Sequence, residues 1–132
     1  MNPVALPVLY CCAICGNLVE KVHDGGGGLI CCNVPMSAAG PAPAGADDIH
    51  AMELRPGDSG LVLTVGGGGH PATQRHYLRW AALYRPDLRL VARLLLGPGV
   101  SGSFAFPVNL KGPVLSIVHC SAHGLFYTIH EL

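Results

Sequence analysis

The stretch YCCAICGNLVEKVHDGGGGLICCNVPM, residues 10–36, decides the fold of the first part of the chain and holds five of its six cysteines. Cys12 and Cys15 form a C-x-x-C pair, a spacing that brings two sulfurs to one metal ion while the chain turns at Gly16. A tetrahedral metal site uses four thiolates. One cysteine of the five is therefore in excess.

The second pair of cysteines, Cys31 and Cys32, is adjacent in sequence, and adjacent side chains on an extended chain point apart. Both sulfurs reach one ion only if the backbone bends there, which Asn33, Pro35 and the four preceding glycines allow. Two tight groups of cysteines suit a metal site better than a disulfide framework. The even total of six nevertheless leaves a disulfide framework as an alternative.

The composition restricts the class of protein. The chain has 132 residues, half of them apolar, and eight Lys and Arg balance eight Asp and Glu. Charged residues make up 12%, about half the usual ~25%, so we expect no nucleic-acid partner and no membrane partner. No apolar run approaches the roughly 20 residues of a membrane-spanning helix, and MNPVALPVLYCC lacks the basic region of a signal peptide. We therefore expect a cytoplasmic protein, whose thiols stay reduced.

The turn signals and the Pro- and Gly-rich stretch SAAGPAPAGADD indicate two parts. We predict a metal-stabilised module at residues 1–37, a linker at 38–48 and a larger domain at 49–132. The module is too short to build its own hydrophobic core. In the larger domain, residues 88–96 alternate with the period of a half-buried strand, and frequent turns favour a β-sandwich. The segment HYLRWAALYR, residues 76–85, is equally compatible with helix and strand.

The cysteine-rich stretch resembles the desulforedoxin-type, rubredoxin-like iron module at the start of desulfoferrodoxins, the two-iron superoxide reductases. The shared pattern is an aromatic residue, C-x-x-C-G-N, V-E, a His-x-Gly-Gly-Gly loop and C-C-x-x-P-M. The resemblance implies an iron site with ligands Cys12, Cys15, Cys31 and Cys32, and it leaves Cys11 as the extra thiol. A structural zinc ion is the alternative, because four thiolates also accept zinc.

The sequence around the histidines of the larger domain resembles a second known domain. The segments DDIH, GGGGHPATQRH and HCSAHGLF resemble the iron-binding domain of superoxide reductases, which implies the ligands His50, His70, His76, Cys120 and His123. Four neutral imidazoles hold ferrous iron, a non-haem site, and the thiolate takes an axial position opposite an open one. The resemblance implies an immunoglobulin-like β-sandwich and one-electron reduction of superoxide to hydrogen peroxide. It further implies a rubredoxin-like electron donor and a homodimer.

The two residues immediately before His50 differ from the residues that the family has at these positions. Asp48 and Ile49 stand where the family has glutamate and lysine. That glutamate can reach the open position of the resting site, and aspartate is one methylene shorter, so closure by Asp48 is in doubt. Ile49 removes a cation from the place where an anion must arrive. We therefore regard Asp48, Ile49 and Cys120 as the residues that set the catalytic behaviour.

The remaining histidines occupy no ligand position of the family, and we expect packing or surface roles for them: His23, His119 and His130. We expect packing roles for Tyr77 and Trp80 as well.

Two other functions are compatible with the sequence. One is a non-catalytic zinc- or iron-binding module for metal storage or transfer. The other is an electron carrier that keeps the small module and has lost activity at the other site. Metal content and the colour of the oxidised protein separate the enzyme from a zinc module, and peroxide formation from superoxide separates it from a carrier.

Overall fold

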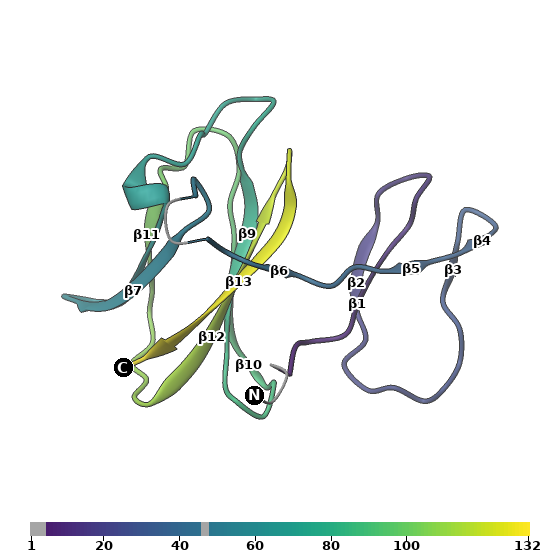
Figure 1. Cartoon of the computed structure of the whole chain (residues 1–132), viewed down its shortest axis with the longest axis horizontal. Coiled ribbons are helices and arrows are strands. Elements are labelled where there is room, and N and C mark those ends of the chain that lie inside the picture. Colours follow the sequence, from purple (N-terminus) through teal and green to yellow (C-terminus); the bar gives the residue numbers. More distant parts are fainter. Residues whose placement is uncertain (1–4, 46–47) are drawn as a thin grey trace. The chain divides into compact units, whose positions relative to one another are not determined.

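The computed structural model describes residues 5–45 and 48–132. The chain divides into two compact units, of which the first ends at Gly40 and the second runs from Pro41 to Leu132. Figure 1 shows that both units are built from strands joined by short turns and loops. Within the described residues, no helix has the length and apolar character needed to cross a membrane.

The first unit contains five short strands: β1 (Leu9–Cys11), β2 (Leu18–Glu20), β3 (Ile30–Cys31), β4 (Val34–Pro35) and β5 (Ser37–Ala38). Strand β1 lies between β2 and β5 in an antiparallel sheet, and β3 pairs with β4 in a separate hairpin. Among the described residues of this unit, only Pro7, Leu9 and Cys12 are buried. Apolar burial therefore contributes little to its stability, and another source of stability is needed.

The backbone bends at both cysteine pairs. Cys32 and Asn33 have φ angles of 51° and 66°, in the left-handed region that most residues avoid and asparagine tolerates better. This bend joins β3 to β4. Gly16, with a φ of 81°, makes the turn after the C-x-x-C pair, and its amide donates to the Cys12 carbonyl at 2.9 Å. Each cysteine pair therefore lies at a tight turn, as the sequence predicts.

The second unit is a β-sandwich. Its elements are β6 (Ala42–Pro43), β7 (Met52–Gly57), β8 (Gly60–Val65), the 3-10 turn η1 (Gly66–Gly68), β9 (Leu78–Tyr84), β10 (Leu90–Leu95), β11 (Ser103–Phe106), β12 (Pro113–Cys120) and β13 (Gly124–Glu131). One sheet has the order β10-β9-β12-β13-β6 and the other the order β11-β8-β7 (Figure 1). Side chains from both sheets, such as Leu63, Leu83 and Val118, form one apolar core. The predicted mainly-β fold class is confirmed.

Strand pairing decides the segments that the sequence left ambiguous. Residues 76–85 contribute the strand β9, because β9 pairs with β10 on one side and with β12 on the other. The strand predicted at 88–96 begins only at Leu90. Leu88 has a φ of 67° in the preceding turn, where the Asp87 carboxylate accepts from the Arg89 amide at 3.1 Å.

The stretch expected to be a linker contributes strands to both units. Ser37 and Ala38 pair with β1 in the first unit. Ala42 and Pro43 pair in parallel with β13 in the second. Residues 46 and 47 of the expected linker, like residues 1–4 of the expected module, lie outside the described part of the chain.

Candidate metal centres

The first candidate centre is formed by four cysteines of the small unit. The sulfurs of Cys12, Cys15, Cys31 and Cys32 all lie within 4.8 Å of one another. Cys15 Sγ and Cys31 Sγ are 3.6 Å apart. Tetrahedral sulfurs at the Zn–S distance of ~2.3 Å would be about 3.8 Å apart, whereas a disulfide needs about 2.05 Å. All six cysteines are free, so the disulfide alternative is wrong.

Cys11 stands apart from this group. Its Sγ lies 3.7 Å from the carbonyl oxygen of Cys12, and it is absent from the cluster of four sulfurs. Cys11 ends β1 and is half-buried, whereas Cys12 follows the strand and is buried. The fold therefore brings Cys12, and not Cys11, together with Cys15 as the C-x-x-C pair.

The sulfurs differ as acids. The backbone amides of Cys15 and Ile14 point toward Cys12 Sγ and lower the pKa of that thiol to about 6. The neighbouring sulfurs of Cys15 and Cys12 raise the pKa of Cys32 to about 12, and they also raise the pKa of Cys31. The thiolate of Cys12 forms readily, and those of Cys31 and Cys32 are opposed by their neighbours. A cation among the four sulfurs removes this opposition, so the group fits a metal ion.

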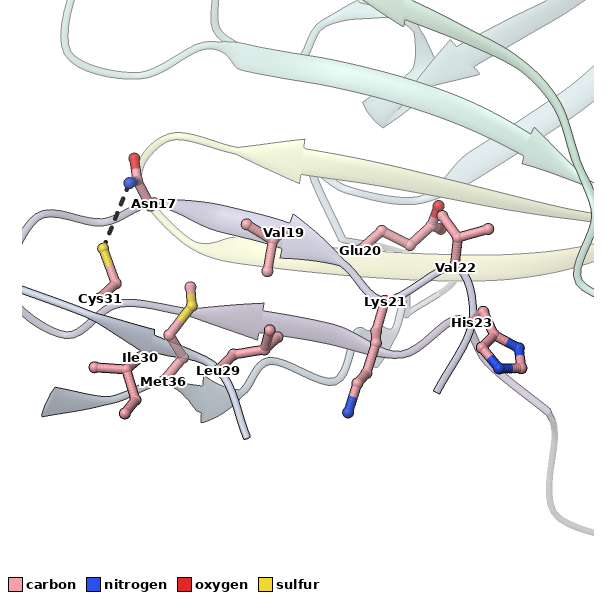
Figure 2. Close-up of a pocket in the computed structure, with 10 residues that line it drawn as sticks. All are labelled: Asn17, Val19, Glu20, Lys21, Val22, His23, Leu29, Ile30, Cys31 and Met36. Carbon is pink, nitrogen blue, oxygen red and sulfur yellow. Dashed lines mark hydrogen bonds between the residues drawn. The ribbon is translucent and has the colours of Figure 1, made fainter. Parts of the chain in front are cut away.

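A groove of about 520 Å³ lies beside the four-cysteine centre. Figure 2 shows the Asn17 side chain directed at Cys31, where Asn17 Nδ2 donates to Sγ at 3.6 Å. On the same groove, Lys21 Nζ donates to the Gly27 carbonyl at 2.9 Å and pairs with Asp24 at 2.7 Å, which holds the glycine-rich loop. A hydrogen bond to a ligating sulfur tunes the charge that the sulfur offers a metal. The hydrogen bond from Asn17 would therefore lower the charge that Cys31 Sγ offers a metal ion in this centre.

The second candidate centre lies in the sandwich. His50 precedes β7, His70 follows η1, His76 precedes β9 and Cys120 ends β12. One ring nitrogen of each histidine and Cys120 Sγ all lie within 4.8 Å of one another. The exposed His123 completes the set, because its Nδ1 is 3.8 Å from Cys120 Sγ and its ring centroid is 4.8 Å from that of His76. The fold thus gathers the residues predicted for this centre, with His123 outside the tightest group.

In three of these imidazoles the Nε2 nitrogen lacks a protein partner. Nε2 of His50, of His70 and of His76 is buried without a hydrogen bond. Burial is the main cause that lowers the pKa of His50 and of His70, so both rings are neutral near pH 7. His70 Nδ1 lies 2.8 Å from the Pro71 carbonyl, which only accepts, so the proton is on Nδ1 and the lone pair on Nε2. Buried lone pairs without donors are costly, and a metal ion would take them.

Contacts around the histidines hold the loops together. The Phe126 ring stacks on His50, with centroids 4.0 Å apart and ring planes at 10°. Ser121 Oγ accepts from the Tyr77 amide at 3.0 Å, and the Ser121 amide donates to the Tyr77 carbonyl at 2.8 Å. These bonds tie the loop after Cys120 to the start of β9. Sequence reasoning missed Ser121, for which the sequence carries no signal, and it noted Phe126 only as an aromatic residue after H-G-L.

Gly66 permits the close approach of two of these loops. Its φ is 62° and its amide donates to the Ala51 carbonyl at 2.8 Å. A Cβ at this position would lie 2.4 Å from the Ile49 carbonyl oxygen. Glycine is therefore required where the loop of His50 meets the turn that leads to His70.

Comparison with known proteins shows the family of the chain. Residues 8–38 match the family described as desulfoferrodoxin, N-terminal domain. A desulfoferrodoxin homolog from Methanothermobacter thermautotrophicus is 31% identical over 121 residues, which cover 90% of this chain and 95% of that protein. The chain belongs to the desulfoferrodoxin family. A desulfoferrodoxin from Nitratidesulfovibrio vulgaris is likewise 31% identical over 117 residues, 88% of this chain and 90% of that protein.

The fold of this desulfoferrodoxin-family chain is also found among solved structures. The superoxide reductase from Treponema pallidum superposes with a TM-score of 0.68 and 16% sequence identity, over 93% of this chain and 98% of that one. A superoxide reductase fold therefore accounts for nearly the whole chain.

The two departures from the desulfoferrodoxin pattern lie on the loop before His50. Asp48 Oδ1 accepts from the His50 amide at 3.2 Å and lies 3.2 Å from His50 Nδ1. The backbone bond from His50 is the main cause that lowers the pKa of the Asp48 carboxyl, so it is ionised at neutral pH. The Ile49 side chain is 43% exposed and places an apolar surface beside the centre.

The other three histidines of this desulfoferrodoxin-family chain lie outside the two groups of candidate ligands. His23 is exposed on the groove of the small unit. The His119 ring lies 5.9 Å from the Trp80 ring, and His130 Nε2 lies 2.7 Å from Ser116 Oγ.

Proposed function

We propose that this protein is a superoxide reductase, an oxidoreductase that gives one electron to superoxide, which takes up two protons from solvent and forms hydrogen peroxide. The observation that carries the proposal is the group of partnerless histidine nitrogens gathered around Cys120 Sγ. Family membership and the fold support it. We further propose iron in both centres, because four thiolates accept iron or zinc and imidazoles with one thiolate suit ferrous iron.

The residues of the sandwich centre would divide the work as follows. Iron held there would supply the single electron. The neutral rings of His50 and His70 would act as ligands through a nitrogen that carries no proton. Cys120, 1% exposed, would supply the one anionic donor, and a thiolate donates electron density that favours reduction of a bound oxygen species. Because Ile49 carries no charge, the superoxide anion would be attracted by the charge of the metal and by the exposed Arg75.

An outside electron donor is needed, because each turnover removes one electron from the protein. We propose a rubredoxin-like donor and a homodimer, both on the family resemblance. Free thiols require a reducing compartment, so we propose the cytoplasm as the location. The activity would then contribute to superoxide detoxification.

Anaerobically purified protein tests the proposal directly. A pulse of superoxide should yield about one hydrogen peroxide per superoxide consumed, with no oxygen released. Cys120→Ser should keep metal through the imidazoles and lose most of the rate, because both the anionic donor and its electron donation are removed. Cys12→Ser should retain superoxide reduction, since its centre lies in the other unit. Oxygen release in the stoichiometry of a dismutase, or a normal rate in Cys120→Ser, would overturn the proposal.

A further inference from the structure

We propose that Asp48 is a positioning residue that accepts a hydrogen bond from His50 Nδ1 and directs His50 Nε2 to the metal. On this view Asp48 is not a ligand that closes the centre. The inference rests on the proposed function only in requiring that the histidine and cysteine group holds a metal.

One carboxylate oxygen makes both contacts. Asp48 Oδ1 accepts from the His50 backbone amide at 3.2 Å and lies 3.2 Å from Nδ1 of the same residue. His50 Nδ1 is buried and makes no hydrogen bond in this arrangement, so it lacks an acceptor. The Asp48 side chain is 40% exposed, so a small rotation of the carboxylate aligns it with the ring nitrogen. The His50 ring is 3% exposed and has little freedom to move instead.

The carboxylate selects the tautomer of His50. A neutral imidazole carries one proton, and a carboxylate beside Nδ1 favours the proton on that nitrogen. The lone pair is then on Nε2, which is buried without a protein partner. Stacking on Phe126 at 4.0 Å holds the plane of the ring. Asp48 and Phe126 together leave His50 one orientation and one free lone pair.

The same contacts argue against Asp48 as a closing ligand. Its Oδ1 already accepts from the His50 amide, two residues later, so a closing role would require this bond to break. A carboxylate that orients a ligating histidine is worth about 10- to 100-fold in metal affinity or activity. We expect Asp48 to raise the affinity of the histidine and cysteine centre for its metal by such a factor.

The test measures the affinity of the histidine and cysteine centre in the full chain, with cobalt(II) as the spectroscopic probe and a chelator as competitor. Asp48→Ala should lower that affinity by about 10- to 100-fold and shift the cobalt spectrum. The four-cysteine centre in the same sample should be unchanged. Asp48→Asn keeps an oxygen that can accept from the His50 amide and from Nδ1 but loses the charge, and it should lose less affinity than Asp48→Ala. Asp87→Asn is the matched control, because Asp87 makes the same bond to the Arg89 amide at 3.1 Å and should have no effect.

Two results would overturn the inference. Wild-type affinity and spectrum in Asp48→Ala would mean that the Asp48 side chain does not position His50. In the oxidised iron protein, tighter azide binding in Asp48→Ala than in wild type would identify Asp48 as a closing ligand. Neither readout depends on superoxide. Failure to form peroxide would therefore refute the proposed function and leave this inference standing.

Discussion

Protonation of His119 is expected near pH 4, far below the ordinary range of histidine. Burial is the main cause that lowers the pKa of His119 to about 4 from 6.5, and the neighbouring Arg79 adds to it. His119 on β12 is directly opposite Trp80 on β9, with ring centroids 5.9 Å apart. Trp80 is the only tryptophan of the chain and reports on this ring.

The free energy at stake follows from the gap between the two pKa values. A gap of about 2.5 pKa units at ~1.4 kcal/mol each gives about 3.4 kcal/mol, and partial exposure of the ring reduces this to about half, ~1.5 kcal/mol. As the pH falls, the unfolded chain takes up the proton first, because its histidine keeps the higher pKa. The stability is therefore complete above pH 6.5 and is lost between pH 6.5 and about 4.

Comparison of wild type with His119→Gln isolates this contribution, because protonation of the metal ligands is common to both. The free energy of unfolding should fall by about 1.5 kcal/mol more in wild type than in the variant between pH 7.5 and 4.5. Trp80 fluorescence should show a step near pH 4 in wild type only, since a protonated imidazole quenches a neighbouring indole. A step at pH 6 to 6.5, or identical pH dependence of the two proteins, would refute the reasoning.

Other substitutions probe the cysteine register, the approach of superoxide and the loop contact. Cys11→Ser should keep the metal of the small unit and Cys12→Ser should lose it, as metal content will show; an empty centre in Cys11→Ser would mean that the register is wrong. Ile49→Lys should raise the second-order rate constant for superoxide by up to about 10-fold at low salt and make it fall more steeply with added salt, and an unchanged rate at low salt would contradict this. Gly66→Ala should cost roughly 2 kcal/mol or more of stability, because a Cβ would lie 2.4 Å from the Ile49 carbonyl oxygen. Gly67→Ala is its control, with a φ of 67° and nothing within 4 Å, and should cost only about 1 kcal/mol; equal unfolding midpoints would count against the contact.

The candidate ligands were predictable from the sequence because metal binding restricts residue type and local spacing. The C-x-x-C pair and the adjacent cysteines of the small unit lie at turns whose geometry is determined within a few residues. Gly16 at a φ of 81° and Asn33 at 66° have the conformations that their sequence positions indicated. The mainly-β character was equally readable, because frequent turns and short alternating runs are local patterns.

Contacts between distant residues required the tertiary structure. Local propensity left residues 76–85 undecided, and pairing of β9 with two neighbours made them a strand. The stacking of Phe126 on His50 and the bonds between Ser121 and Tyr77 join residues that are distant in sequence and meet only in the folded chain. Sequence spacing specifies a turn because few bonds intervene, but it does not specify which side chains meet across a sheet.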